Sequence, residues 1–398
     1  MTTVADTALT VREPSRATGA SPVARWPSEG AGVTDVARWI RDRTTRLVAV
    51  VVVATMASVG PPPLPAQATA PGTVRVLTRN LYFGGDLGPS VAAPDLATFL
   101  AANAALLNHV DLVDFPARAR LFAAEIGEHR PDLVGLQEVA LWRTGPIGDP
   151  APATTVRYDY LALLLAELAG AGLRYDVAVA LDEADLEAPA GAPHNLDARL
   201  TLRDVILVRR GGRLRVTGTS AAHFTRNLVA TIRATGDTVT FTRGWTAVDA
   251  TREGRPIRFV NTHLEAVDPA VRTRQAAELS RGPLRRRSST VLVGDLNSGP
   301  DLPSPADRAA YLTLLAGGMR DTWPLLHPRD PGFTADLGED LDQPATSLEH
   351  RLDMIMIRGA VVPVWSRRFG TERQTPDGRW ASDHLGHVAA LVVFGRHR

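Results

Sequence analysis

The sequence predicts an α/β fold in which helices cover the faces of β-sheets. Two observations support this prediction. Short apolar runs typical of strands recur from residue 74 to residue 394, and three longer segments between them have helical patterns. Strands mixed with helices pack as layers around a common core. No stretch within residues 74–396 has the composition of a linker, so we expect one domain there.

The expected strands are apolar or alternating runs: 74–79, 132–137, 175–180, 204–208, 237–249, 257–262, 290–294, 353–357 and 388–394. The expected helices are 95–108, 116–129 and 157–170. The second helix should end at Arg130-Pro131, because the residue before a proline disfavours helical backbone. Residues 238–249 and 257–261 have the pattern of a hairpin that turns at Glu253-Gly254-Arg255.

Long polar connections separate several of these elements. They are 84–94, 139–156, 182–200, 298–306 and 326–350. Connections of this length in a compact domain are commonly functional or disordered. We therefore expect some of them to form the rim of a site.

The first 68 residues have the organisation of a secretion signal behind an extension. We interpret residues 1–46 as a disordered or misassigned N-terminal extension that ends in a basic region with Arg41, Arg43 and Arg46. Residues 47–68 combine a 13-residue apolar stretch with Ala66-Gln67-Ala68. Cleavage after Ala68 would leave a short linker, 69–73, before the domain at 74–396. The apolar stretch is shorter than the roughly 20 residues that cross a bilayer. We expect a secreted protein, with a membrane anchor at 47–59 as the alternative.

The composition excludes several kinds of chemistry. The chain has no cysteine, and all 44 basic residues are arginine. Thiol catalysis, zinc–thiolate sites, disulfides, Schiff-base lysines and P-loop lysines are therefore ruled out. Residues 1–68 carry seven arginines and five acidic residues, which leaves a net charge of −1 for the remainder. That balance shows no basic excess of the kind that by itself indicates nucleic-acid binding.

Polar side chains stand at the ends of the expected strands. Asp295 and Asn297 follow the run 290–294, and side chains two apart on a strand point to the same side. Both can therefore face one phosphate or one metal. Similar positions are occupied by Asn80, Gln137-Glu138, Thr262-His263, Asp353 and Asp383-His384. Carboxylate, amide and imidazole groups at strand ends are what a metal-assisted phosphoester hydrolase requires.

The order of these motifs resembles the endonuclease/exonuclease/phosphatase family, the DNase I-like hydrolases. The resemblance covers residues 74–396 and rests on Asn80, Gln137-Glu138, Thr262-His263-Leu264, Gly294-Asp295-Leu296-Asn297, Leu352-Asp353 and Ser382-Asp383-His384. It implies a four-layer sandwich in which two mixed β-sheets pack face to face and helices flank them. It also implies a site at one end of that sandwich.

The expected metal is Mg²⁺, with Mn²⁺ or Ca²⁺ as alternatives. Glu138 is the first choice of ligand, because a carboxylate on a buried strand is costly without a cation. Asn80 is expected beside it as a neutral oxygen donor. Asp383 is expected to bind a second cation or a metal-bound water.

The expected catalytic residues are His384, Asp353, His263, Asp295 and Asn297. The resemblance pairs His384 with Asp353, an arrangement that raises the pKa of an imidazole. His384 and Asp295 are alternatives for the general base, and His263 would donate to a phosphate or leaving oxygen. Weaker candidates are Arg203-Asp204 and Arg243.

These features predict a divalent-metal-dependent enzyme that hydrolyses phosphodiesters or phosphomonoesters by in-line attack of water. A nuclease is placed slightly ahead of a sphingomyelinase-like or inositol-phosphate phosphodiesterase. Tyr82 weakens the nuclease assignment, because many DNA-repair members of the family carry an acidic residue there. A catalytically silent surface binding module is the third alternative. The expected partner is a phosphoester substrate, either nucleic acid or a phospholipid head group, and we expect a monomer without a stable protein partner.

Overall fold

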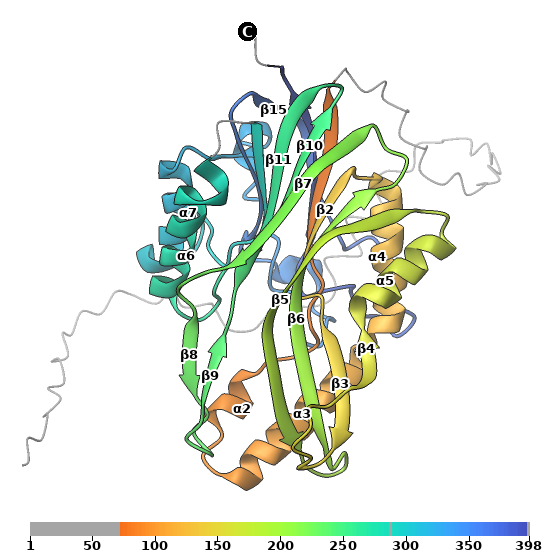
Figure 1. The fold of residues 1–398 in the computed structure, drawn as a ribbon, viewed down its shortest axis with the longest axis vertical. Coiled ribbons are helices and arrows are strands. Elements are labelled where there is room, and N and C mark those ends of the chain that lie inside the picture. Colours follow the sequence, from red (N-terminus) through yellow and green to blue (C-terminus); the bar gives the residue numbers. More distant parts are fainter. Residues whose placement is uncertain (1–71, 286–288, 396–398) are drawn as a thin grey trace, which may run out of the picture. The chain divides into compact units, whose positions relative to one another are not determined.

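The computed structural model describes residues 72–285 and 289–395. Two large β-sheets of mixed direction pack face to face, and helices cover the outer face of each (Figure 1). This arrangement confirms the four-layer α/β sandwich. The N-terminal extension and the signal region at 1–68 lie outside the described residues.

The first sheet contains eight strands. Its order is β15 (Val361–Phe369), β16 (Gly386–Val393), β1 (Thr73–Asn80), β2 (Leu133–Gln137), β6 (Leu196–Arg209), β3 (Leu141–Pro146) and β4 (Thr155–Asp159), and β5 (Tyr175–Ala190) also pairs with β6. Strands β1 and β2 run parallel, with Asn80 opposite Gln137. The remaining pairs are antiparallel.

The second sheet contains six strands. Its order is β13 (Arg320–Asp321), β14 (Asp353–Arg358), β12 (Ser289–Asp295), β11 (Arg255–His263), β10 (Gly244–Arg252) and β7 (Leu214–His223). Strands β11 and β12 are parallel, so their carboxyl ends share one edge of the sheet. A separate hairpin of β8 (Leu228–Thr231) and β9 (Thr238–Phe241) extends beyond the sheet toward α2 (Gly88–Ala92) (Figure 1).

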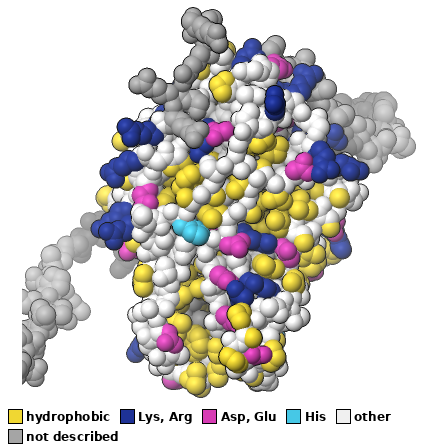
Figure 2. Space-filling model, viewed as in Figure 1, with side chains coloured by type: hydrophobic (Ala, Val, Ile, Leu, Met, Phe, Trp, Pro, Cys, Tyr) yellow, Lys and Arg dark blue, Asp and Glu magenta, His cyan; other side chains and the backbone are white. Residues whose placement is uncertain are grey.

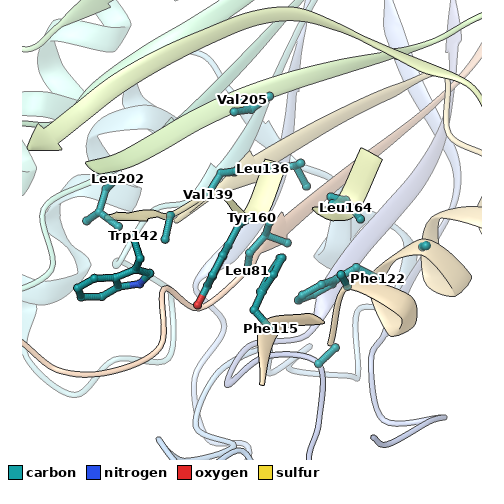
Figure 3. Packing of buried hydrophobic residues seen from close by; sticks show 14 of the residues in the cluster. Leu81, Phe115, Phe122, Leu136, Val139, Trp142, Tyr160, Leu164, Leu202 and Val205 are labelled. Atoms are coloured by element: carbon teal, nitrogen blue, oxygen red, sulfur yellow. The ribbon is translucent and has the colours of Figure 1, made fainter. Parts of the chain in front are cut away.

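Three apolar cores hold the layers together. The central core lies between the sheets and includes Val76, Phe259, Val291, Ile355 and Leu391. On the outside of the first sheet pack α3 (Leu96–Leu112), α4 (Phe115–His129) and α5 (Tyr160–Gly170). There the rings of Phe115 and Tyr160 stack with centroids 3.4 Å apart (Figure 3). Helices α6 (Pro269–Arg281) and α7 (Pro305–Ala316) cover the second sheet.

Several predicted elements are confirmed and others are wrong. The three predicted helices correspond to α3, α4 and α5. The predicted strand 237–249 is wrong, because the chain leaves β9 at Phe241 and enters β10 at Gly244. The predicted loops at 139–156 and 182–200 are also wrong. They hold β3, β4 and the outer halves of β5 and β6, which pair as one long ribbon.

Short helical turns complete the described chain: α8 (Thr322–Leu326) and the 3₁₀ turns Pro283–Arg285 and Ala345–Ser347. Within the described ranges, no single helix is both long and apolar enough to cross a membrane. Helices α3 and α4 meet that criterion only as a pair bent by 48°.

Candidate active site

Strand register brings the polar strand ends of both sheets to one end of the sandwich. In the second sheet Asp295 lies opposite His263 on one side and opposite Asp353 on the other. In the first sheet Asn80 and Glu138 come from the neighbouring ends of β1 and β2. The two rows meet where Asn80 Nδ2 lies 3.2 Å from Asp295 Oδ2. One group of side chains is therefore shared by both sheets.

Asn80 is a hydrogen-bond donor to the carboxylates in this arrangement. Its Nδ2 also donates to Glu138 Oε1 at 3.1 Å, and its Oδ1 accepts from the backbone N–H of Tyr82 at 2.8 Å. The oxygen that was expected to face a metal is therefore turned toward the backbone. Asn80 thereby positions the carboxylates of Glu138 and Asp295.

Glu138 and the nearby Tyr82 both have left-handed backbone conformations. The φ angles of Tyr82 and Glu138 are 53° and 55°, values that non-glycine residues adopt at a cost. The carboxylate of Glu138 in turn accepts from the backbone N–H of Phe83 at 2.8 Å. Arg118, which is fully buried, donates to the carbonyls of Leu81 at 2.7 Å and Ala381 at 2.9 Å. It thereby ties the loop after β1 to the segment that carries Asp383.

Asp295 is surrounded by donors. Its Oδ1 accepts from the backbone N–H of Asn297 at 2.9 Å, within a turn where Asn297 has a φ of 46°. Burial alone would raise the pKa of Asp295, but His384 and His263 outweigh it and lower the pKa. Asp295 is therefore held as an anion. The predicted pair of Asp295 and Asn297 does lie on one side, and a turn rather than a continued strand places it there.

His384 and Asp353 form the pair that the resemblance implies. His384 Nδ1 lies 2.8 Å from Asp353 Oδ2 and 3.8 Å from Asp295 Oδ2. Burial favours the neutral ring, but the charges of Asp353, Asp295 and Asp383 prevail and raise the pKa of His384 well above its usual value. The geometry therefore presents an imidazolium beside the carboxylate of Asp295.

His263 has a cationic partner. Arg243 Nη1 lies 2.6 Å from His263 Nδ1, and arginine can only donate, so Nδ1 accepts and the ring hydrogen is on Nε2. Burial and then Arg243 lower the pKa of His263 to about 3. Nε2 lies 3.1 Å from Asn297 Nδ2 and 3.6 Å from Asp295 Oδ2, and of these two atoms only the carboxylate oxygen can accept its hydrogen. His263 is thus a neutral donor aimed into the site.

Two buried acidic residues, Glu183 and Asp204, lie near Arg243. Glu183 accepts from the backbone N–H of Gly244 at 2.8 Å and lies 3.7 Å from Arg243 Nη1. Burial raises the pKa of Glu183 to about 7 and raises that of Asp204 well above its usual value. Sequence reasoning ranked Arg243 and Asp204 low and missed Glu183, because residues 182–200 were predicted as a loop. Arg203 points away from this cluster, toward Asp159 and the carbonyl of Val139.

Family membership follows from a match over most of the chain. The sequence profile of the Endonuclease/Exonuclease/phosphatase family matches residues 80–384, which spans every motif of this site. The chain belongs to that family. It is accordingly a metal-dependent phosphoester hydrolase. No curated protein sequence matches the chain.

Solved structures of this family share the fold. A family protein from Bacteroides thetaiotaomicron is 14% identical with a TM-score of 0.52, covering 82% of this chain and 100% of its own. TDP2 from D. rerio, solved with a single-strand DNA product, is 16% identical with a TM-score of 0.49, covering 80% and 98%. The mannosyl-6-phosphatase Bt3783 of B. thetaiotaomicron is 15% identical with a TM-score of 0.49, covering 80% and 99%. The first of these structures supports the shared fold, and an identity this low leaves the substrate open.

The acidic residues of this family member fit a divalent cation. Burial, followed by the charge of Asp383, raises the pKa of Glu138, and burial also raises that of Asp383. Two half-buried carboxylates that disfavour each other's charge would be stabilised by a bound cation. Within the described ranges, two further clusters have ligand atoms within 4.8 Å of one another: Asp295, Asp353 and His384, and Glu183, Asp204 and His263.

Proposed function

We propose that the protein hydrolyses phosphodiester bonds by in-line attack of water with the help of Mg²⁺. The observation that carries this proposal is the position of Asp295. Its Oδ2 lies 3.2 Å from Asn80, 3.6 Å from His263 and 3.8 Å from His384. A carboxylate in the centre of three donors can orient a water and accept its proton beside a bound phosphate.

Glu138 and Asp383 are the proposed ligands of the metal. When bound, Mg²⁺ would offset the negative charge of the phosphate and of the leaving oxygen. Mn²⁺ and Ca²⁺ prefer similar oxygen ligands and remain alternatives. Asn80 keeps the Glu138 carboxylate oriented through its 3.1 Å hydrogen bond.

Asp295 is our choice for the general base. It is ionised and accepts a proton as the oxygen of water bonds to phosphorus and the ester oxygen departs. His384, held by Asp353, supplies positive charge to the phosphate oxygens, while the Nε2–H of His263 donates to a phosphate or leaving oxygen. Asn297, hydrogen-bonded to the carbonyl of Leu264 at 3.0 Å, limits the position of the phosphate on the same side.

The substrate and the location of the enzyme are the finer parts of the proposal. The motifs placed a nuclease slightly ahead of a phosphodiesterase that acts on lipid or small head groups. The cavity beside the site is lined mostly by apolar and acidic residues, and this lining favours the second class. We retain secretion as a proposal that depends on the segment at 47–68.

The test compares the full chain and the chain from Thr69 on plasmid DNA, RNA, sphingomyelin and bis-p-nitrophenyl phosphate, with Mg²⁺ or with a chelator. Turnover that the chelator abolishes supports the proposal. Asp295→Asn should reduce kcat by about 10²–10⁴, the range for a general base. Asp301→Asn, a nearby acidic residue that binds the backbone of Arg351, is the control for charge alone. Equal turnover by wild type and Asp295→Asn would exclude Asp295 as the base.

A further inference from the structure

A cavity opens directly beside the proposed metal ligands. Its volume is about 500 Å³, and Glu138, Asp383 and Arg243 form the end nearest the catalytic residues. Most of the remaining lining is apolar and includes Phe83, Leu87, Val91, Leu228, Ala230 and Phe241. The cavity is therefore continuous with the place where the phosphate must bind.

The β8–β9 hairpin builds one wall of this cavity. Leu228 and Ala230 alternate inward along β8, whereas Val229 between them is 61% exposed. Phe241 of β9 pairs with Leu228 and lines the same wall. The backbone N–H of Arg233 donates to the carbonyl of Val91 at 3.0 Å, which ties the hairpin to α2. Figure 2 shows hydrophobic side chains in the hollow between the hairpin and β5.

The charged residues of the lining have mostly one sign. Asp86, Glu265 and Glu339 add to Glu138 and Asp383. Of the described residues that line the cavity, Arg243 is the only basic one, and it already contacts His263 and Glu183. A nucleic acid would bring further phosphates to both sides of the scissile one, and those phosphates need cationic partners. This wall repels a second phosphate and accommodates an uncharged or cationic group.

We propose that the cavity binds the hydrocarbon substituent of the scissile phosphodiester. The substrate class is then a lipid-type phosphodiester with an uncharged or cationic head group. This inference rests on the proposed function, because it assigns a substrate to the same catalytic residues. It differs from that function in predicting which phosphodiester is preferred.

A series of p-nitrophenyl phosphodiesters isolates the contribution of the cavity. The methyl, butyl and hexyl esters share the bond that breaks and the p-nitrophenolate that leaves, and differ only in the other substituent. With Mg²⁺, kcat/KM should rise by about two- to fourfold for each added CH₂, the upper value corresponding to full burial. A thymidine 5′-ester of the same leaving group represents a nucleotide and should be a poorer substrate than the hexyl ester.

The outcomes separate this inference from the proposed function. Metal-dependent turnover with a flat series, or with the thymidine ester preferred, overturns the inference and leaves the hydrolase proposal standing. Absence of metal-dependent turnover of all esters overturns both. A rising series with the thymidine ester last supports both.

Variants on opposite faces of one strand provide the matched control. Leu228→Asn places an amide in the apolar wall and should lower the hexyl-to-methyl ratio of kcat/KM about fivefold or more. Val229→Asn alters the exposed face of the same strand and should keep the wild-type ratio. If Leu228→Asn lowers the Tm, Val91→Asn tests the lining that α2 contributes. An unchanged ratio in a folded Leu228→Asn and in Val91→Asn would contradict the proposal.

One further comparison distinguishes whether the enzyme takes such a substrate as a free amphiphile or from a membrane. Dihexanoyl phosphatidylcholine below its critical micelle concentration presents a free amphiphile, and vesicles of a long-chain phosphatidylcholine present a membrane. Faster hydrolysis of the monomer indicates that the cavity takes free amphiphiles, and faster hydrolysis of the vesicles indicates a membrane source. Hydrolysis of neither, with DNA cleaved, would contradict the lipid-type class.

Discussion

Arg243 Nη1 donates to His263 Nδ1 across 2.6 Å, so the histidine that faces the site is paired with a cation. The guanidinium is itself held by Glu183, whose other oxygen accepts from the backbone of Gly244. This chain of contacts keeps the ring neutral and places its hydrogen on Nε2. Arg243 is therefore a positioning residue for His263, and it brings positive charge near the phosphate.

Arg243→Met should lower kcat about 10²-fold, comparable with the loss of an electrostatic donor. The change should be visible in the ¹⁵N NMR spectrum of His263. In wild type the ring hydrogen is on Nε2, whereas in the variant it should be shared between Nδ1 and Nε2 as a mixture of two tautomers. Arg233→Met, on the exposed end of the hairpin, serves as the control for loss of one positive charge. An unaltered His263 spectrum in Arg243→Met would show that the hydrogen bond does not set the tautomer.

His384→Ala should lower kcat by at least 10²-fold, because the variant loses the positive charge beside the phosphate. It should also lower the Tm, because Asp353 is fully buried and loses its cationic partner. Asp353→Asn should also lower kcat, because His384 would lose the negative charge 2.8 Å away that keeps its ring protonated. His350→Ala, whose ring contacts Asp336 outside the site, is the matched histidine control. Steady-state kinetics measure all three, and wild-type turnover by His384→Ala would remove His384 from the mechanism.

Glu138→Gln should raise the Mg²⁺ concentration needed for half-maximal activity and reduce the increase in Tm that Mg²⁺ produces. A metal that binds the folded state stabilises it by RT ln(1 + [L]/Kd), which amounts to about 2.7 kcal/mol at 100 Kd. The thermal shift reads binding without reference to turnover. Asp86→Asn, an exposed acid of the same cavity, should leave the titration unchanged. Identical Mg²⁺ curves for Glu138→Gln and wild type would reject Glu138 as a ligand.

His387 should make the fold sensitive to acid. Burial lowers its pKa from 6.5 to about 3, so between these values the unfolded chain binds a proton that the folded protein does not. The contribution is absent above pH 6.5 and becomes increasingly destabilising as the pH falls, reaching about 2 kcal/mol at pH 5. His387→Leu should therefore lose less unfolding free energy than wild type between pH 7 and pH 5. Urea unfolding at both values measures this difference, and equal losses would show that His387 is protonated in the folded state.

Much of the group of polar side chains at the candidate site was predictable because these residues stand at strand ends. Asn80, Glu138, His263, Asp295, Asp353 and His384 each follow or precede an apolar run, and parallel pairing brings such ends to one edge. Helices α3, α4 and α5 were predictable because their apolar periodicity is local. The prediction that two sheets pack face to face came from the family resemblance. The alternation of residues within a strand does not show to which sheet that strand belongs.

Contacts between distant segments decided the remaining features. Glu183 reaches Arg243 across 60 positions because β5 extends into a ribbon with β6, whose polar outer half has the composition of a loop. The rotation of the Asn80 amide depends on the backbone of Tyr82, and the apolar cavity depends on a hairpin docked to α2. Local patterns of residue type therefore determined the family and most of the side chains that gather at the candidate site. Their partners, charge states and adjoining substrate wall arise from packing, because each depends on side chains that become neighbours only when the sheets close.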